Sequence, residues 1–98
     1  MNASIAIQVL PKVLEQEETR RIVDEVIAYI ASTGLHYVVG PFETTLEGDL
    51  EQLLDIVKEC CCICTRSGAP SVMSYVKISY KPDGVWTIDD KTGKYQNT

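Results

Sequence analysis

Hydrophobic and polar positions alternate at the start of the chain. Between residues 4 and 10 (Ser-Ile-Ala-Ile-Gln-Val-Leu), Ile5, Ile7 and Val9 fall on one side of an extended backbone. An alternation with a period of two is typical of a half-buried β-strand, which Pro11 is expected to close. The apolar side of this strand is the first part of the predicted core.

The period then changes to that of a helix. The segment from Leu14 to Thr19 is acidic and is expected to form a turn, and from about Thr19 apolar residues recur every three or four positions. Gly34 can adopt a positive φ and is expected to end this helix. The predicted apolar stripe consists of Ile22, Val23, Val26, Ile27 and Ile30.

A second helix is predicted after Gly48. Asp49 suits the N-cap position, and Gln52 follows three residues later in an arrangement that resembles a capping box. Gly68 and Pro70 are expected to terminate the helix. Its predicted apolar stripe consists of Leu50, Leu53, Leu54, Val57, Cys61 and Cys64.

The remaining segments favour strands. Residues 36–39 and 42–47 are rich in β-formers and flank Gly40-Pro41, which predicts a β-hairpin. Residues 71–80 form the longest strand candidate, and Pro82-Asp83-Gly84 turns the chain after it. A short helical patch, residues 88–95, follows a possible cap at Thr87.

The order of these elements is β-α-β-β-α-β with a short C-terminal helical appendage. It predicts an α+β, ferredoxin-like fold: a four-stranded antiparallel sheet with two helices on one face. A chain of 98 residues is too short for two cores, so residues 1–98 are expected to form one domain.

Composition excludes several classes of function. The net charge is −5 and the nine basic residues are scattered, which argues against binding nucleic acid. No apolar run approaches the roughly 20 residues that span a bilayer, and the start of the chain does not resemble a signal peptide. A cytoplasmic protein without a membrane partner is expected.

Four cysteines crowd into Cys60, Cys61, Cys62 and Cys64. A disulfide among them would close only a tiny loop, and three consecutive helical thiols cannot converge tetrahedrally on zinc. Packing as small hydrophobic residues explains them best, so the thiols are expected to be reduced and structural.

No group of residues signals catalysis, a cofactor or a metal site. His36 is the single histidine and is expected to be a surface or edge residue. Glu43 and Glu47 share a strand but lie about 13 Å apart by strand rise, which is too far for a shared water or metal. The chain is therefore not expected to be an enzyme, and a small enzyme is the weakest of the functions considered.

The sheet face turned away from the two predicted helices carries mixed chemistry. A sheet face in water should be polar throughout, whereas here apolar side chains alternate with hydrogen-bonding ones. Such a surface is either an ordinary solvated face with incidental hydrophobic residues or one that a subunit or ligand covers. The residues predicted there include Gln8, Leu10, Val38, Thr45, Glu47, Met73, Tyr75 and Lys77.

Three stretches resemble the YkoF-like thiamine-binding protein family, long a family of unknown function. They are Ile5–Pro11, Tyr37–Asp49 and Val76–Tyr80, and the likeness extends to residues 88–91. Its most specific part is Gly-Pro-Phe-Glu-Thr-Thr-Leu-Glu-Gly at residues 40–48. The cysteine cluster and the short tail depart from the family pattern.

The resemblance implies a ferredoxin-like homodimer, in some members a homotetramer, that binds thiamine or its hydroxymethylpyrimidine moiety without turnover. A pyrimidine with an exocyclic amine needs a paired donor and acceptor and a flat apolar surface. Gln8, Thr45 and Glu47 are the candidate polar contacts, and Glu47 would also favour a cationic thiazolium. Phe42 and Tyr75 are the candidate aromatic contacts. The alternative is a regulatory or assembly module whose open sheet face binds a partner protein.

Overall fold

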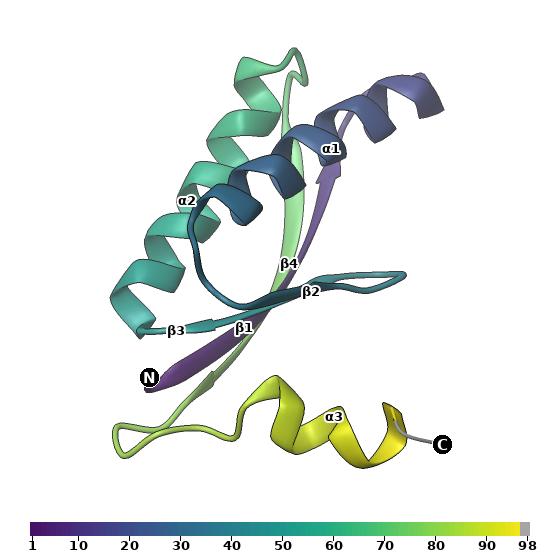
Figure 1. The fold of residues 1–98 in the computed structure, drawn as a ribbon. Coiled ribbons are helices and arrows are strands. Elements are labelled where there is room, and N and C mark those ends of the chain that lie inside the picture. The colour runs from purple at the N-terminus through teal and green to yellow at the C-terminus, as the bar shows by residue number, and fades with distance from the viewer. Residues whose placement is uncertain (97–98) are drawn as a thin grey trace.

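The computed structural model describes residues 1–96, and it confirms the predicted order of elements (Figure 1). Four strands and two long helices alternate as β-α-β-β-α-β, and a third helix follows. The elements are β1 (Ala3–Pro11), α1 (Gln16–Ser32), β2 (Tyr37–Val39), β3 (Thr44–Gly48), α2 (Leu50–Arg66), β4 (Val72–Tyr80) and α3 (Ile88–Gln96).

The four strands form one antiparallel sheet in the order β2-β3-β1-β4. β1 pairs with β4 along its whole length, from Ala3 opposite Tyr80 to Pro11 opposite Val72. Its pairing with β3 is shorter and ends at Ile7. Helices α1 and α2 cover one face of this sheet, so the ferredoxin-like α+β fold is confirmed (Figure 1).

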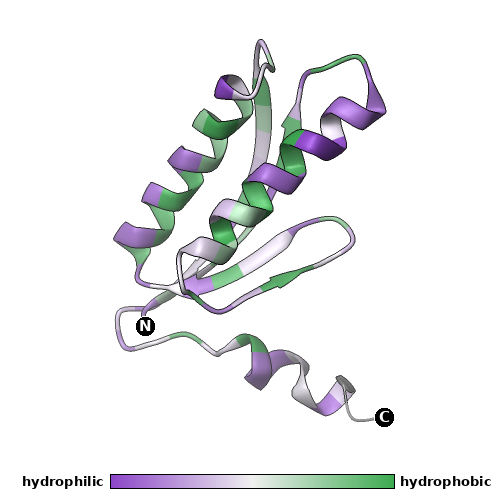
Figure 2. Ribbon diagram, turned by 45° about the horizontal axis from the view of Figure 1, so that its top comes forward, coloured by the Kyte–Doolittle hydropathy of each residue, from purple (hydrophilic) through white to green (hydrophobic). Residues whose placement is uncertain are grey.

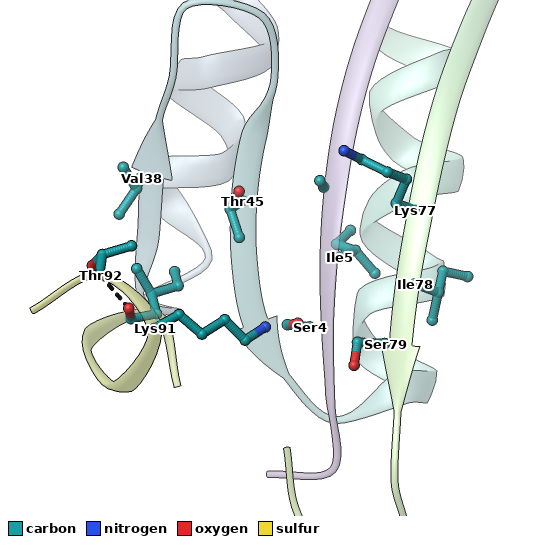
Figure 3. Close-up of a pocket in the computed structure, with 11 residues that line it drawn as sticks. Ser4, Ile5, Val38, Thr45, Lys77, Ile78, Ser79, Lys91 and Thr92 are labelled. Atoms are coloured by element: carbon teal, nitrogen blue, oxygen red, sulfur yellow. Dashed lines mark hydrogen bonds between the residues drawn. The ribbon is translucent and has the colours of Figure 1, made fainter. Parts of the chain in front are cut away.

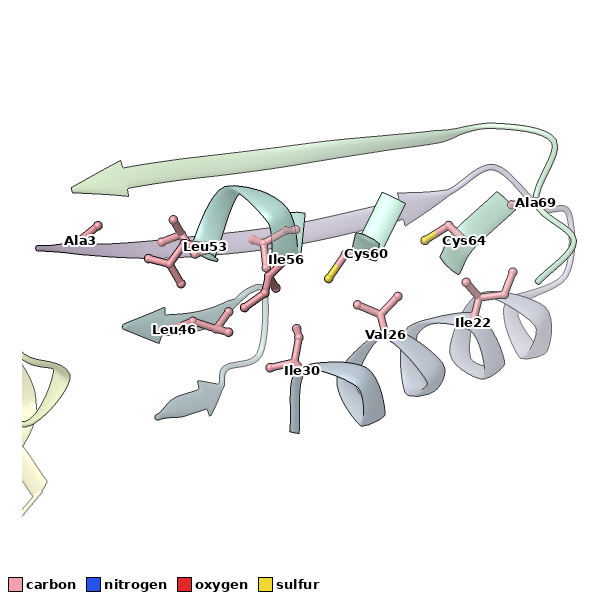
Figure 4. Close-up of a cluster of buried hydrophobic side chains, with 12 residues drawn as sticks. Ala3, Ile22, Val26, Ile30, Leu46, Leu53, Ile56, Cys60, Cys64 and Ala69 are labelled. Atoms are coloured by element: carbon pink, nitrogen blue, oxygen red, sulfur yellow. The ribbon is translucent and has the colours of Figure 1, made fainter. Parts of the chain in front are cut away.

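The core lies between the sheet and these two helices (Figure 4). Figure 2 shows hydrophobic residues at intervals along α1 and α2, as expected for helices with one buried side. Burying each large aliphatic side chain stabilises the fold by about 1.5–3 kcal/mol relative to exposing it. The buried cluster consists of Ala3, Ile5, Ile7, Ile22, Val26, Ile30, Leu46, Leu53, Ile56, Cys60, Cys64 and Ala69.

Helix α1 begins earlier than the sequence predicts. The acidic segment expected to be a turn already contains its first turn, which starts at Gln16, and Glu17 and Glu18 belong to it. Carboxylates are favourable there because the first turn of a helix carries partial positive charge. The end of the helix agrees with the prediction, since Gly34 has a φ of 79°.

Helix α2 buries a stripe that differs from the predicted one. Ile56 and Cys60 lie in the core with Leu53, whereas Leu54 is 44% exposed and Cys61 is only half-buried. The apolar residues of α2 extend over more than one side of the helix, so the sequence alone allows either of two neighbouring sides to be buried. In the structure, the buried side is the one that packs against the sheet. The prediction of Leu54 and Cys61 as core residues was therefore wrong.

The start of α2 is capped from a distant part of the chain. Asp49 occupies the predicted N-cap position, but its side chain makes no capping hydrogen bond. Instead the Asn2 side-chain oxygen accepts a hydrogen bond from the backbone N–H of Leu50 at 2.9 Å. The backbone carbonyl of Asn2 also accepts the N–H of Lys81 at 2.9 Å. The residue before β1 thus ties together the beginning of α2 and the end of β4.

Strand alternation favours Val72, Val76 and Ile78 as the core-facing residues of β4. Val72 and Val76 pack against the core as expected, but Ile78 is 48% exposed. β4 is an edge strand, so only β1 pairs with it and its outer side has no neighbouring strand. Within residues 1–96, the structure contains no helix that is both long enough and apolar enough to cross a membrane.

Candidate functional site

The open face of the sheet is defined by the side chains that point away from α1 and α2. Strand register places these side chains in rows across the sheet. One row contains Val38, Thr45, Ala6 and Lys77, from β2, β3, β1 and β4 respectively. The rows beside it are Glu47-Ser4-Ser79 on one side, and Gln8-Tyr75 followed by Leu10-Met73 on the other.

Helix α3 lies against one end of the open face, a placement that the sequence did not predict (Figure 1). Its first residue, Ile88, is only 9% exposed. The Ile88 backbone N–H donates to Glu47 Oε2 at 2.8 Å. A carboxylate is a favourable partner for the unpaired N–H groups at a helix start. The open face is therefore partly covered by the chain's own third helix.

A capping box fixes the start of α3, as the position of Thr87 suggested. The N–H of Thr87 donates to Asp90 Oδ2, and the N–H of Asp90 donates to Thr87 Oγ1, each at 2.9 Å. The hydrogen bond from the Thr87 N–H holds the pKa of Asp90 below its usual range. This local geometry sets the direction in which α3 crosses the sheet.

A cavity of about 380 Å³ lies between α3 and the open face, and we call it the α3 cavity (Figure 3). Its volume is in the range of small-molecule sites. Apolar groups such as Ala6, Val38 and Ile88 form part of its wall. Its polar lining consists of Ser4, Thr45, Lys77, Ser79, Lys91 and Thr92.

The polar groups of the α3 cavity are mostly unengaged. Thr92 Oγ1 donates to the Ile88 carbonyl at 2.9 Å. Among residues 1–96, no hydrogen-bond partner is found for the hydroxyls of Ser4, Thr45 or Ser79. These three hydroxyls come from β1, β3 and β4, so together they form a strip of free donors and acceptors across the sheet.

The charged groups of the site differ in their partners. Lys77 Nζ lies 2.8 Å from Glu43 Oε1. Lys91 extends from α3 toward Ser4 (Figure 3), and no carboxylate oxygen of the described residues lies within 4.0 Å of its Nζ. Glu47 is buried at 9% exposure, and its Oε1 lies 4.0 Å from His36 Nε2 while its Oε2 binds α3.

The five predicted ligand residues lie along the open face but not in one cavity. Thr45 lines the α3 cavity and a hollow of about 250 Å³ beside it, which Phe42 also lines. Gln8 and Phe42 line a groove of about 250 Å³ that reaches α1, where β3 no longer pairs with β1. Tyr75 is opposite Gln8 and is 58% exposed, and Glu47 lies beneath the start of α3.

Several cavity residues were missed by sequence reasoning. Ser4 lies on the same side of β1 as Ala6, so the alternation could have included it. Ser79 lies on the open face beside Lys77, as the alternation predicts, but it was not among the predicted ligand residues. Lys91 and Thr92 gave no such signal, because the sequence does not show where a short terminal helix docks.

The cysteines have the properties of packed side chains. All four are free, and Cys60 and Cys64 are buried. Burial, with a smaller contribution from Cys61 and Cys64, raises the pKa of the Cys60 thiol to about 12. A thiol is a nucleophile only as the thiolate, so low reactivity is expected of the buried Cys60 thiol in the folded protein. In the described part of the chain, no three His, Cys, Asp or Glu side chains are grouped so as to hold a metal ion.

Comparison with known proteins decides the family. The family model for "Thiamine-binding protein" matches residues 5–96. The chain belongs to the thiamine-binding protein family. A UPF0045 protein of Clostridium perfringens is 50% identical over 93 residues, which cover 95% of this chain and 96% of the relative. The predicted resemblance is thus confirmed, and the family is named for binding a small molecule.

Solved structures of similar proteins share the fold over nearly the whole chain. A domain of unknown function from Bacillus cereus is 37% identical with a TM-score of 0.87, covering 98% of this chain and 91% of that one. A candidate thiamine biosynthesis/salvage protein from Thermotoga maritima is 35% identical with a TM-score of 0.86, covering 97% and 99%. Both family membership and fold therefore extend across β1 to α3.

Proposed function

We propose that this protein binds thiamine, or its hydroxymethylpyrimidine moiety, on the open face of the sheet without transforming it. The observation that supports this most directly is the α3 cavity, whose apolar wall and free hydroxyls suit a small heteroaromatic ligand. Membership of the thiamine-binding protein family supports the ligand class. Residues 1–98 act as one binding domain in this proposal.

The predicted contacts are assigned along the face as follows. Thr45 supplies a hydroxyl from inside the cavity, and Gln8 supplies the amide that can pair with an aminopyrimidine as donor and acceptor. Phe42 and Tyr75, both exposed, offer flat surfaces for the ring. Glu47 acts through its negative charge, because its oxygens already lie beside the Ile88 N–H and His36.

The proposal includes assembly into at least a homodimer that covers the open face. Large apolar side chains remain exposed there, with Met73 at 47%, Tyr75 at 58% and Val38 at 43%. Apolar side chains grouped on one face are typical of a surface that another subunit covers. The proposal places the protein in the cytoplasm, which the four free cysteines support.

Isothermal titration calorimetry with thiamine and with hydroxymethylpyrimidine tests the function. We expect saturable heat with at least one of them, and Gln8→Ala is expected to weaken it about three- to tenfold, as for a lost neutral hydrogen bond. Gln16→Ala is the control, since Gln16 is exposed at the start of α1. The absence of heat with either ligand at millimolar concentration would refute the proposal.

A second candidate is a regulatory or assembly module that binds a partner protein through the open face. Phe42, at 79% exposed, is the observation that favours it, because a protruding aromatic residue is a frequent anchor in interfaces. A stoichiometric partner recovered by pull-down, together with a melting temperature that neither vitamin ligand changes, would favour this second function.

A further inference from the structure

The α3 cavity offers more hydrogen-bond donors and positive charge than a neutral pyrimidine uses. Lys91 and Lys77 both line it, together with the hydroxyls of Ser4, Thr45 and Ser79. Those three hydroxyls have no partner among residues 1–96. A group with several acceptor oxygens would satisfy them at once.

Each of the two carboxylates near this cavity has a partner within the protein. Glu43 pairs with Lys77 at 2.8 Å. Glu47 accepts the N–H of Ile88 and is buried under α3. The Lys91 ammonium is thus the cationic group of the cavity for which no acid of the described residues lies within 4.0 Å. It reaches over the sheet toward Ser4, as Figure 3 shows.

The position of Lys91 depends on the docking of α3. Ile88 and its hydrogen bond to Glu47 hold the first turn of α3 against the sheet, and Lys91 lies one turn further along the same helix. Ile88 and Lys91 are neighbours on the helix surface and both line the cavity, whereas Lys94, one turn further on, does not. The helix therefore supplies a cation to a site whose hydroxyls come from the sheet.

We propose that the α3 cavity binds the phosphate of a phosphorylated ligand, so that the physiological ligand is a phosphate ester of thiamine or of its pyrimidine. Lys91 provides the charge, and Ser4 and Ser79 provide hydroxyl donors. Charge-assisted hydrogen bonds from an ammonium to a phosphate are among the strongest available to a protein. The inference rests on the proposed function for the identity of the ring, but the anion site itself can be tested separately.

The first experiment compares thiamine with thiamine monophosphate by calorimetry in a phosphate-free buffer. We expect the monophosphate to bind about tenfold more tightly, as for one added charged hydrogen bond. In Lys91→Gln the two affinities are expected to become equal within about twofold. Lys94→Gln is the matched control on α3, because it removes the same charge outside the cavity and should preserve the difference. Equal affinities in the unsubstituted protein would overturn the inference while leaving the proposed function intact.

The second experiment uses inorganic phosphate alone and separates the two proposals if neither vitamin form binds. Amide chemical shifts of the protein are followed during titration with sodium phosphate and, as the ionic-strength control, with sodium chloride. Saturable shifts near Ser4, Ser79 and Lys91 that disappear in Lys91→Gln would support the anion site even if the proposed ring is wrong. Identical responses to the two salts, together with no preference for the monophosphate, would overturn it.

Discussion

Identical residues that are close together in this sequence differ in how deeply they are buried. The cysteines at positions 60 to 64 lie within one and a half turns of α2, yet Cys60 and Cys64 are buried while Cys61 and Cys62 are half-buried. Position on the helix face, and not residue type, determines the environment of each thiol. Cys60 and Cys64 thus lie on the side of α2 that faces the core, and Cys61 and Cys62 lie outside that side.

The thiols are predicted to react with iodoacetamide in an order set by this placement. Between pH 8 and pH 10, Cys62 is expected to be alkylated in the folded protein while Cys60 is not. The pKa of Cys60 is raised to about 12, so its thiolate is scarce until the pH approaches that value, whereas in the unfolded chain it forms near pH 9. Peptide mass spectrometry after timed quenching measures the order, and alkylation in urea provides the control. Equal rates at Cys60 and Cys62 in the folded protein would contradict the assignment.

The same raised pKa fixes the sign of its effect on stability. Below pH 9 Cys60 is neutral in both states and contributes no pH dependence. Above pH 9 the unfolded chain loses the proton first, so the unfolded state gains stability until the pH reaches about 12. Alkaline conditions therefore favour unfolding through this residue.

Elements are positioned by contacts that cross long stretches of the chain. The cap of α2 is an example, since the Asn2 oxygen that receives the Leu50 N–H lies 48 residues away in sequence. Asp49 is in the N-cap position, but its side chain makes no capping hydrogen bond, and the Asn2 side chain makes one in its place. The beginning of β1 therefore takes part in the stability of a helix in the middle of the chain.

Replacing Asn2 by Ala is expected to lower the free energy of unfolding by about 1 kcal/mol, the usual loss for a capping side chain. Asp49→Ala is the matched comparison and should cost less, because its side chain contributes only through the charge near the helix start. Urea denaturation followed by circular dichroism measures both. A larger loss in Asp49→Ala than in Asn2→Ala would show that the assignment of the cap is wrong.

Most of the element pattern could be predicted because each strand and helix has its own period and stop signals. Alternation located β1, and Gly34 ended α1 as expected. The buried side of α2 was partly mistaken, since Leu54 and Cys61 belong to an apolar run wider than one helix face. The docking of α3 left no trace in the periodicity, because Ile88 is the single buried anchor among the described residues of that helix.

At the scale of the whole molecule, the open face is the surface on which we propose both ligand binding and assembly. Strand parity placed Gln8, Thr45 and Tyr75 on that face, and the register agrees. The alternation along each strand does not show that α3 packs over the open face. The position of Lys91 in the cavity was therefore not predicted. The role of the five predicted residues in binding stays a prediction.

Tyr75→Asp is expected to yield monomers if a second copy covers the open face. The substitution would place a charge where the proposed interface excludes water, which costs several kcal/mol per unpaired charge. Tyr80→Asp is the matched control: Tyr80 lies on the same strand with a similar exposed fraction, 51% against 58%, but has the opposite parity. Size-exclusion chromatography with light scattering measures the mass. Persistence of a dimer in Tyr75→Asp would refute the placement of the interface.

The central position of β1 also has a consequence for how the chain folds. β1 is made before its partners β3 and β4, which begin at residues 44 and 72, so its pairing with β4 must wait until most of these 98 residues have been made. Strand pairings between residues far apart in sequence form slowly, because the chain loses the entropy of closing a large loop before the new contacts stabilise it. Helices α1 and α2 can form locally during this time. The apolar strand β1 therefore stays unpaired on its β4 side in the nascent chain until β4 has been made.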